Sequence, residues 1–210
     1  MTIAIFRRFH YAPLAAPLIL GMALSGCAQV SALQAAGTAV GAVLEATGIT
    51  KKENIDLSKI SRDLPIKIYA GDQLNLTSNG KPLSLVVKIY VLRSPEHLKT
   101  LTYQQITSAD GEKEALGEEL VSVREIVLLP GKMYDGILKV PGDATTIGVV
   151  GMFRAPYQSR WKLGFESKLS FDGGITIGAH ACALSASKGS LDFDISPESA
   201  RSLVGLQCNS

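Results

Sequence analysis

The sequence predicts a mainly β protein, folded as a two-layer antiparallel sandwich with a small helical insertion. About eight short segments alternate apolar and polar residues and are separated by turn-forming residues, as the strands of a sandwich are. Within that region one stretch, about residues 94–119, instead has its apolar residues at helical spacing. The composition, 46% hydrophobic and 19% charged with 20 glycines, is typical of a globular protein that favours β-structure.

The first two expected strands alternate cleanly. In residues 64–70, Leu64, Ile66 and Ile68 share one face. In residues 83–92 the polar face carries Ser84, Lys88 and Tyr90, and the apolar face carries Leu85, Val87, Ile89 and Val91. Both segments are therefore expected to bury one face in the sandwich.

The stretch 94–119 then interrupts the strands. Ser94 suits a helix N-cap and Pro95 suits the first helical position. The residues spaced for the buried side of a helix are Leu98, Leu101 and Ile106. We expect short helices here, packed over one edge or end of the sandwich.

The remaining strands follow the insertion. Residues 120–129 and 132–140 flank a Pro130-Gly131 turn and together predict a hairpin, whereas residues 146–153 are apolar on both faces and predict a central strand. Three further strands are expected at residues 161–171, 174–184 and 190–195. In the first of these the expected inward side chains are Trp161, Leu163, Phe165 and Leu169.

The N-terminus has the features of a bacterial lipoprotein signal peptide, expected to cover residues 1–26. Arg7 and Arg8 precede an uncharged apolar run that is too short for a comfortable membrane span. The run ends in Leu-Ser-Gly-Cys at residues 24–27, which resembles the lipobox; an ordinary signal peptide with an incidental cysteine is the alternative.

Lipidation of Cys27 is the expected consequence of this lipobox. The thiol would accept a diacylglycerol and the freed amine an acyl chain, giving an N-acyl diacylglycerol group with enough chains to hold a protein firmly at about 0.8 kcal/mol per buried CH₂. Ala28, in place of an aspartate, fits export to the outer membrane. The expected location is therefore the periplasmic face of the cell outer membrane, with a lipid anchor.

Residues 27–60 are expected to form the lipidated N-terminus and an Ala/Gly-rich tether. Gly37 and Gly41 form a small-xxx-small pair, which can mark helix dimerisation in a membrane, but nearby glutamines favour a weak helix or tether. The sandwich domain with its insertion is expected to occupy residues 61–210.

Two cysteines remain for the exported chain. Because the compartment is oxidising, Cys182 and Cys208 are expected to form a disulfide that pins the C-terminal tail to a late strand. Chain entropy predicts about 3–4 kcal/mol of stabilisation for a loop of this length. No metal site or cofactor is expected, because His97 and His180 have no ligand spacing with these cysteines.

Other chemically capable residues are assigned structural roles. His180 lacks an evident nucleophile and orienting acid, so we expect no catalytic residue and no enzyme activity. Asp192 and Asp194 are expected on a solvated strand face. Trp161 is expected in the core with Arg154 and Arg160 on a loop, an interface patch being the alternative. The net charge of +2 without a basic block argues against a nucleic-acid partner.

Several motifs occur in an order seen in one protein family. They are Leu74-Asn75-Leu76, Gly80-Lys81-Pro82, Val86 to Leu92, Ile147-Gly148-Val149, Phe153-Arg154 and Trp161-Lys162. With the lipobox, they resemble the outer-membrane lipoproteins of bacterial type VI secretion systems, the TssJ, SciN and VasD family. The resemblance covers most of residues 64–195. The Ala/Gly-rich segment 28–50 does not match the family.

This resemblance implies a transthyretin-like sandwich with a structural role. A protein of this family would tether the periplasmic C-terminal region of the inner-membrane M subunit to the outer membrane, and contact the L subunit indirectly. In the family the loop between the first two strands is implicated in that contact. The matching residues here are Asn75, Leu76, Thr77, Ser78, Asn79, Gly80, Lys81 and Pro82. An ordinary hairpin loop is the alternative for these residues.

A second function from another class is a lipid-anchored small-ligand carrier or enzyme that uses the mouth of the sandwich. The shortage of convergent titratable residues disfavours an enzyme. A carrier would require an apolar cavity, which the sequence alone does not decide.

Overall fold

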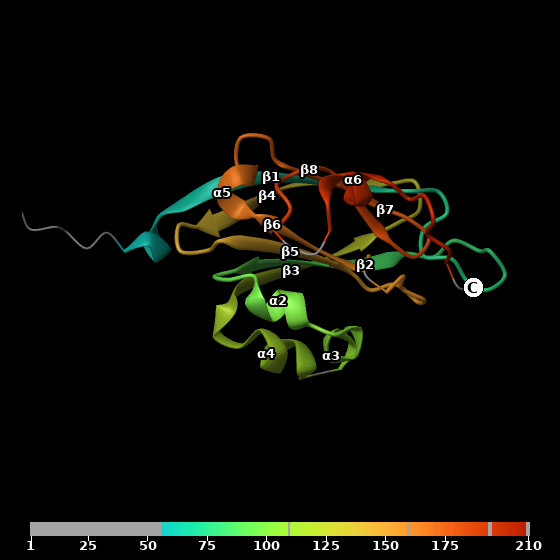
Figure 1. The fold of residues 1–210 in the computed structure, drawn as a ribbon, viewed down its shortest axis with the longest axis horizontal. Coiled ribbons are helices and arrows are strands. Elements are labelled where there is room, and N and C mark those ends of the chain that lie inside the picture. The colour runs from blue at the N-terminus through green and yellow to red at the C-terminus, as the bar shows by residue number, and fades with distance from the viewer. Residues whose placement is uncertain (1–55, 109, 159, 193–194, 209–210) are drawn as a thin grey trace, which may run out of the picture. The chain divides into compact units, whose positions relative to one another are not determined.

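A computed structural model describes residues 56–108, 110–158, 160–192 and 195–208 of the chain. Within these residues the protein is mainly β, with eight strands in two facing sheets and a group of short helices beside one of them (Figure 1). The expected signal peptide, Cys27, most of the tether and Asp194 lie outside the described residues.

Each sheet has four strands. The first sheet has the order β4-β1-β7-β8, formed by Met133–Pro141, Ser61–Ala70, Ile175–Ala179 and Leu184–Lys188. The second has the order β3-β2-β5-β6, formed by Leu120–Leu128, Leu85–Leu92, Thr146–Gly151 and Lys162–Glu166. The two-sheet sandwich is confirmed. Its neighbouring strands run antiparallel except for β1 and β7, which are parallel.

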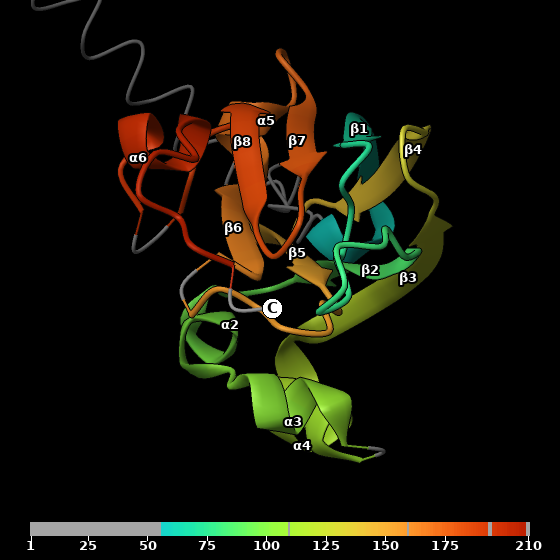
Figure 2. The same cartoon turned by 90° about the vertical axis from the view of Figure 1, so that its right-hand side faces the viewer.

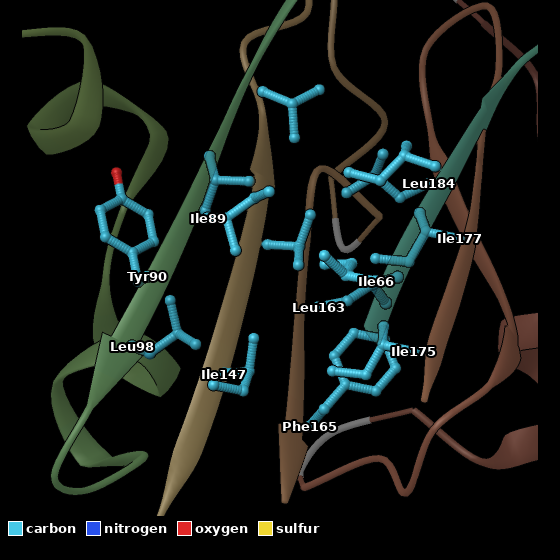
Figure 3. Close-up of a cluster of buried hydrophobic side chains, with 14 of the residues drawn as sticks. Ile66, Ile89, Tyr90, Leu98, Ile147, Leu163, Phe165, Ile175, Ile177 and Leu184 are labelled. Carbon is cyan, nitrogen blue, oxygen red and sulfur yellow. The ribbon is translucent and has the colours of Figure 1, made fainter. Parts of the chain in front are cut away.

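The core lies between the sheets, where the expected inward faces meet (Figure 3). Leu64, Ile66 and Ile68 are fully buried, as their alternation on β1 predicts. All six residues of β5 are buried, which confirms it as a central strand between β2 and β6. Aliphatic and aromatic side chains from both sheets fill the space with few polar atoms, which is the arrangement expected of an aligned sandwich.

The predicted helical insertion is present and consists of short pieces. They are α2 (Glu96–Thr100), α3 (Tyr103–Thr107), α4 (Gly111–Leu116) and the 3₁₀ turn η2 (Gly117–Glu119). Ser94 Oγ accepts a hydrogen bond from the Glu96 N–H (3.2 Å), and Pro95 already has helical dihedral angles. Leu98, Leu101 and Ile106 are buried, as their spacing predicts.

The insertion covers the outer face of the second sheet, not an edge or end of the sandwich as expected (Figures 1 and 2). Leu98 packs against Gly148 so closely that a Cβ on that glycine would lie 2.7 Å from the leucine Cδ2. Tyr90, expected on a polar face, is therefore fully buried. Lys88 of the same face forms an ion pair with Glu112 of α4.

Lys162 on β6 also fixes the insertion. Its Nζ donates to the carbonyl oxygens of Leu98, Lys99 and Leu101, at 2.7, 2.6 and 2.8 Å. These carbonyls lie at the C-terminus of α2, where a helix has unpaired acceptors and partial negative charge. The lysine that alternation places on the polar side of β6 is therefore a cap for a helix from elsewhere in the chain.

The predicted hairpin of residues 120–129 and 132–140 is wrong. The two segments are strands, but β3 pairs with β2 in the second sheet and β4 pairs with β1 in the first. The chain crosses between the sheets at Pro130-Gly131, where Gly131 has φ of 68° and its N–H donates to the Gly71 carbonyl (3.3 Å). A tight turn between two alternating segments does not by itself distinguish pairing within a sheet from crossing to the opposite sheet.

Three later strands are shorter than expected. After β6 the chain turns into α5 (Ser167–Ser170), because the Ser167 N–H and Oγ donate to carbonyls of residues 145 and 144; Leu169 is consequently 67% exposed instead of buried. The expected strand 174–184 ends at Ala179 as β7. A turn that the His180 N–H closes onto the Ala183 carbonyl then leads into β8, which extends to Lys188, beyond the expected strand.

The expected strand 190–195 is also wrong in the part that the structure describes. Residues 190–192 form only an isolated bridge, between Leu191 and Phe165. Two short elements complete the described chain: η1 (Leu57–Lys59) precedes β1, and α6 (Pro197–Arg201) follows β8.

Candidate functional site

The β1–β2 connection, which contains the predicted partner-binding residues, forms a small closed turn. The Thr77 N–H donates to the Lys81 carbonyl and the Gly80 N–H to the Thr77 carbonyl, both at 3.0 Å. Thr77 Oγ1 accepts from the Lys81 N–H at 2.9 Å. Gly80 has φ of 72°, a conformation that glycine adopts readily. These bonds hold residues 78–82 in an exposed tip.

Asn75 supports this tip from below. It is 7% exposed and has φ of 47°, which asparagine tolerates better than most residues. Its Oδ1 accepts from the Arg154 N–H and its Nδ2 donates to the Ser84 carbonyl, both at 2.8 Å. The buried Asn75 is thus a structural residue, and among the predicted loop residues the surface open to a partner is Ser78–Pro82, with Leu76 and Thr77 half-buried.

Two other connections lie against the same end of the sandwich. Arg154, in the β5–β6 connection, is exposed and donates through Nε to the Leu76 carbonyl (3.3 Å). The Asn75 N–H reaches the His180 carbonyl in the β7–β8 turn (3.2 Å), and the Tyr157 N–H reaches the Cys182 carbonyl (2.9 Å). We call the three connections together the loop end of the molecule.

The C-terminal tail also belongs to the loop end. In the structure Cys182 and Cys208 form a disulfide with a Cα–Cα distance of 5.6 Å. The tail, the β7–β8 turn and the start of the β1–β2 connection form a pocket of about 240 Å³ that is partly open to solvent, lined by Gly71, Gln73, His180, Ala181, Cys182, Ala183, Leu203, Leu206 and Cys208. This volume is below the usual range of sites for drug-sized ligands, about 300–1,000 Å³.

Arg160 is not an exposed loop residue, contrary to expectation. It is 6% exposed, and its guanidinium donates to carbonyl oxygens at the C-terminus of α6 and on β8. The acceptors are those of Leu184 (3.1 Å), Ser199 (2.8 Å), Ala200 (3.1 Å) and Ser202 (3.2 Å). Burial lowers the pKa of Arg160 from its ordinary value. The sequence offered no signal for this role, because the four acceptors are backbone atoms.

Trp161 lies in the core as predicted and is 5% exposed. Its ring meets that of Tyr103 edge to face, with centroids 5.1 Å apart. The Tyr103 hydroxyl donates to the Phe153 carbonyl, so α3 is attached to the β5–β6 connection. The Phe153-Arg154 and Trp161 motifs therefore mark contacts between the insertion and the loop end.

His180 has a structural environment. Its Nε2 lies 2.8 Å from Ser185 Oγ, and the pair leaves no room for a side chain at Gly178. Burial, followed by the nearby charge of Arg160, lowers the pKa of His180. No carboxylate among the described residues hydrogen-bonds to the ring, so the arrangement lacks the acid that orients a catalytic histidine.

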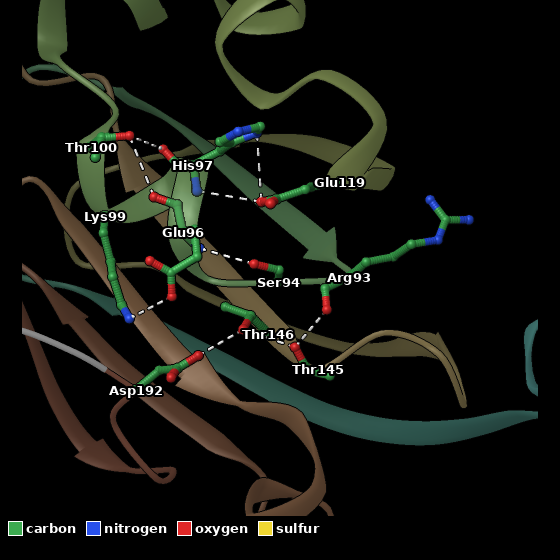
Figure 4. A network of polar contacts seen from close by, with 10 residues as sticks. All are labelled: Arg93, Ser94, Glu96, His97, Lys99, Thr100, Glu119, Thr145, Thr146 and Asp192. Atoms are coloured by element: carbon green, nitrogen blue, oxygen red, sulfur yellow. Dashed lines mark hydrogen bonds and ion pairs between the residues drawn. The ribbon is translucent and has the colours of Figure 1, made fainter.

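Asp192 does not lie on a solvated face. Its Oδ2 accepts a hydrogen bond from Thr146 Oγ1 at 2.6 Å (Figure 4). Its N–H donates to the Gly164 carbonyl at 2.9 Å. It thus attaches residues 190–192 to the second sheet. Among the described residues there is no group of three or more side chains that could hold a metal ion, and no helix long and apolar enough to cross a membrane.

The fold and the loop end define a class of protein, a β-sandwich that presents exposed loops, without a catalytic constellation in the part that the structure describes. The sequence profile of the type VI secretion lipoproteins (T6SS-SciN; VasD, EvfM, TssJ) matches residues 62–182. The chain belongs to this family, which confirms the resemblance seen in its motifs. A comparison with curated protein sequences found no match.

Solved structures have the same fold. A chain described as "Type VI membrane complex" is 26% identical with a TM-score of 0.55, and the match covers 60% of this chain and 98% of that one. The type VI lipoprotein TssJ1 from Pseudomonas aeruginosa is 20% identical with a TM-score of 0.54, covering 61% and 97%. A structure described as the TssM C-terminal domain (869–1107) from EAEC contains a chain 23% identical with a TM-score of 0.52, covering 61% and 98%.

The family is one of structural, membrane-associated type VI secretion lipoproteins, and the chain is a component of that kind. The profile ends at Cys182, so the tail that carries Cys208 lies beyond the matched residues. The loop tip, Asn75 and the insertion all lie within them.

Proposed function

We propose that this chain is an outer-membrane lipoprotein that connects the outer membrane to the type VI secretion membrane complex. An N-acyl diacylglycerol on Cys27 holds the periplasmic leaflet, and residues 76–82 contact the periplasmic C-terminal region of the inner-membrane M subunit. The L subunit is reached only through M. The protein works as a structural connector and not as an enzyme.

The observation that carries this proposal is the rigid, exposed tip of the β1–β2 connection in a chain of this family. Four hydrogen bonds and the buried Asn75 set its shape before any partner arrives. The donors are the backbone N–H groups of residues 77, 80, 81 and 83, of which three donate to carbonyls and that of Lys81 donates to Thr77 Oγ1. A prepared loop loses little conformational entropy on binding. Two solved structures of this fold carry descriptions that name a type VI membrane complex and a TssM C-terminal domain, which supports M as the partner.

The arrangement of β1 suits a connector. The strand begins next to η1 and ends at the β1–β2 connection, and it is hydrogen-bonded on both sides, to β4 and to β7. A pull between the N-terminal side and the loop tip therefore acts along β1. Its hydrogen bonds lie across the direction of force and share the load, so they must break together.

Substitution of the loop tip tests the partner contact. Ser78→Trp combined with Lys81→Glu alters the exposed surface while keeping Asn75 and Gly80, whose positive φ angles shape the loop. We expect the affinity for the purified periplasmic region of M to fall at least about tenfold. Lys113→Glu, on the exposed side of α4, is the matched control. Unchanged affinity of the loop variant would place the contact elsewhere.

Replacement of Cys27 tests the anchor. We expect Cys27→Ser to leave outer-membrane fractions and to abolish type VI-dependent killing of competitors, because the acyl chains are lost. Cys208→Ser removes a different cysteine and keeps the anchor, so it should still fractionate with the outer membrane. If Cys27→Ser protein remained in that fraction, the anchor would be refuted.

A further inference from the structure

The end of the sandwich opposite the loop end is built from three neighbouring pieces. The Gly142 N–H donates to the carbonyls of Leu57 and Ile60, at 3.0 and 2.8 Å, which fixes η1 against the β4–β5 turn. The Ser167 N–H donates to the Thr145 carbonyl at 2.8 Å, which fixes α5 against the same turn. We call η1 with Ile60 and Arg62, residues 142–145 and α5 with residues 171–172 the N-terminal end (Figure 1).

Three exposed aliphatic side chains lie at the N-terminal end. Leu57, Ile60 and Leu169 are 53%, 50% and 67% exposed, and η1 buries none of its residues. They extend from the two short helical elements on either side of the β4–β5 turn. These side chains contribute little to the core, so their apolar surface is free to contact a partner or a membrane.

The charges around them are mixed and mostly paired. Lys59 pairs with Asp56 (3.3 Å), Asp143 pairs with Arg93 (3.0 Å), and the Arg62 guanidinium lies 4.0 Å from the centre of the Phe171 ring. Lys168 and Asp172 are exposed. This end therefore has no strong field of one sign. Long cationic side chains beside aliphatic ones suit the boundary between lipid headgroups and acyl chains. There the methylene groups of the side chain are buried and its charged end remains in contact with water.

We propose that the N-terminal end rests on the lipid surface, with Leu57, Ile60 and Leu169 inserted shallowly into the bilayer. The occupant is a membrane because the chain that leads to Cys27 enters the domain here, at Asp56, one residue before η1. This inference rests on the proposed lipidation of Cys27. Three aliphatic side chains would bind a membrane weakly by themselves, but covalent attachment through residues 28–55 keeps them at high local concentration near it.

The contact would also orient the domain. β1 spans ten residues from the N-terminal end to the loop end, and a strand rises about 3.3 Å per residue. The loop tip would then point away from the membrane, toward a partner that approaches from the periplasm. A domain hanging freely on its tether would have no such preferred direction.

Depth-dependent fluorescence quenching tests the contact. The full-length lipidated protein is reconstituted into vesicles of phosphatidylethanolamine and phosphatidylglycerol with bromine on the acyl chains. Single Leu57→Trp and Leu169→Trp variants report on the N-terminal end, and Val204→Trp, 93% exposed in the tail at the loop end, is the matched control. The buried Trp161 gives a background that the unsubstituted protein measures.

We expect the reporters at positions 57 and 169 to be quenched at least about twofold more than the reporter at position 204, because only they reach the acyl chains. Vesicle flotation of the same samples monitors the anchor separately. Protein that floats without preferential quenching at positions 57 and 169 would overturn this inference while leaving the lipid anchor intact. Protein that does not float would overturn the anchor and the inference with it.

Discussion

At the scale of single residues, backbone carbonyls do more to position polar side chains than other side chains do. Arg160 and Lys162 are separated by one residue, yet each binds the C-terminus of a different helix, α6 and α2 respectively. Cations at helix C-termini satisfy unpaired carbonyls and complement the helix dipole. Arg160, at the end of the β5–β6 connection, thus holds the C-terminal segment, and Lys162, at the start of β6, holds the insertion.

Arg160→Met tests this role. Methionine keeps much of the bulk but leaves four carbonyls without their donor, so we expect the free energy of unfolding to fall by roughly 2–4 kcal/mol. Urea denaturation measures the change. Arg154→Met, at an exposed arginine of the same connection, should change it by less than about 0.5 kcal/mol. Equal effects of the two substitutions would contradict a special role for Arg160.

His180 gives the protein a defined response to acid. Burial lowers the pKa of His180 below its ordinary value of 6.5 in the folded state, so unfolding favours protonation. Its contribution to stability is therefore complete above about pH 6.5 and is lost as the pH falls toward the lowered folded-state pKa. We expect His180→Gln to unfold with a smaller loss of stability between pH 7 and pH 5 than the unsubstituted protein, as measured by urea denaturation at each pH. Identical pH profiles would contradict this assignment.

At the scale of elements, the packing of the helical insertion depends on a residue without a side chain in the second sheet. This residue is Gly148, and the Leu98 side chain occupies the space above it. The Lys88–Glu112 ion pair, the Lys162 cap and the Tyr103–Trp161 contact surround this point. The insertion is thus fixed by its buried aliphatic side chains together with polar and aromatic contacts to the second sheet, and this tertiary packing accounts for helices of only five or six residues being stable there.

Gly148→Val tests the fit of the insertion. The added side chain would occupy the place of Leu98, so we expect the free energy of unfolding to fall by about 1–3 kcal/mol and the hydrogen exchange of residues 96–116 to accelerate. Gly173→Ala, where an added Cβ would meet no atom within 4 Å, is the control. Unaltered exchange in the insertion would show that Gly148 does not determine its packing.

Sequence reasoning located the elements better than their connections. Alternation identified the inner faces of β1 and β2 correctly because one face of each is buried in the core. It failed at Tyr90, whose outer face is covered by helices from later in the chain. It also failed at Leu169, because Ser167 donates hydrogen bonds to the carbonyls of residues 144 and 145 and turns the chain out of the sheet. Both failures depend on contacts between distant residues, which a local pattern does not contain.

The candidate site was predicted in a similar way. The Asn79-Gly80 turn could be expected from its residue types, and the tip is indeed exposed. The burial of Asn75 depends on its hydrogen bonds with two other residues. Arg154 is distant in the sequence, and Ser84 lies on the other side of the loop. Residue types therefore identified the tip as a turn, whereas only the fold separates its exposed residues from the one that supports them.

At the scale of the whole molecule, the disulfide ties the C-terminal tail to the loop end. Because the Cys182–Cys208 bridge closes a separation of 26 residues, its loss should cost about 3 kcal/mol. We expect Cys208→Ser to lower the melting temperature by roughly 6–12 °C in a domain of this size, measured by calorimetry. Mass spectrometry of the protein isolated from cells should find one disulfide; two free thiols would contradict the bridge.

The parallel pairing of β1 with β7 has a consequence for how the protein matures. Ile66 pairs with Ile175, half the chain away, and β1 is enclosed between that strand and β4. A sheet that needs its first and penultimate strands side by side is completed only after nearly the entire polypeptide is present, which makes such topologies slow to fold. We therefore expect the first sheet to form only once the strand Ile175–Ala179 is available, so a chain exported as proposed would complete its fold after translocation.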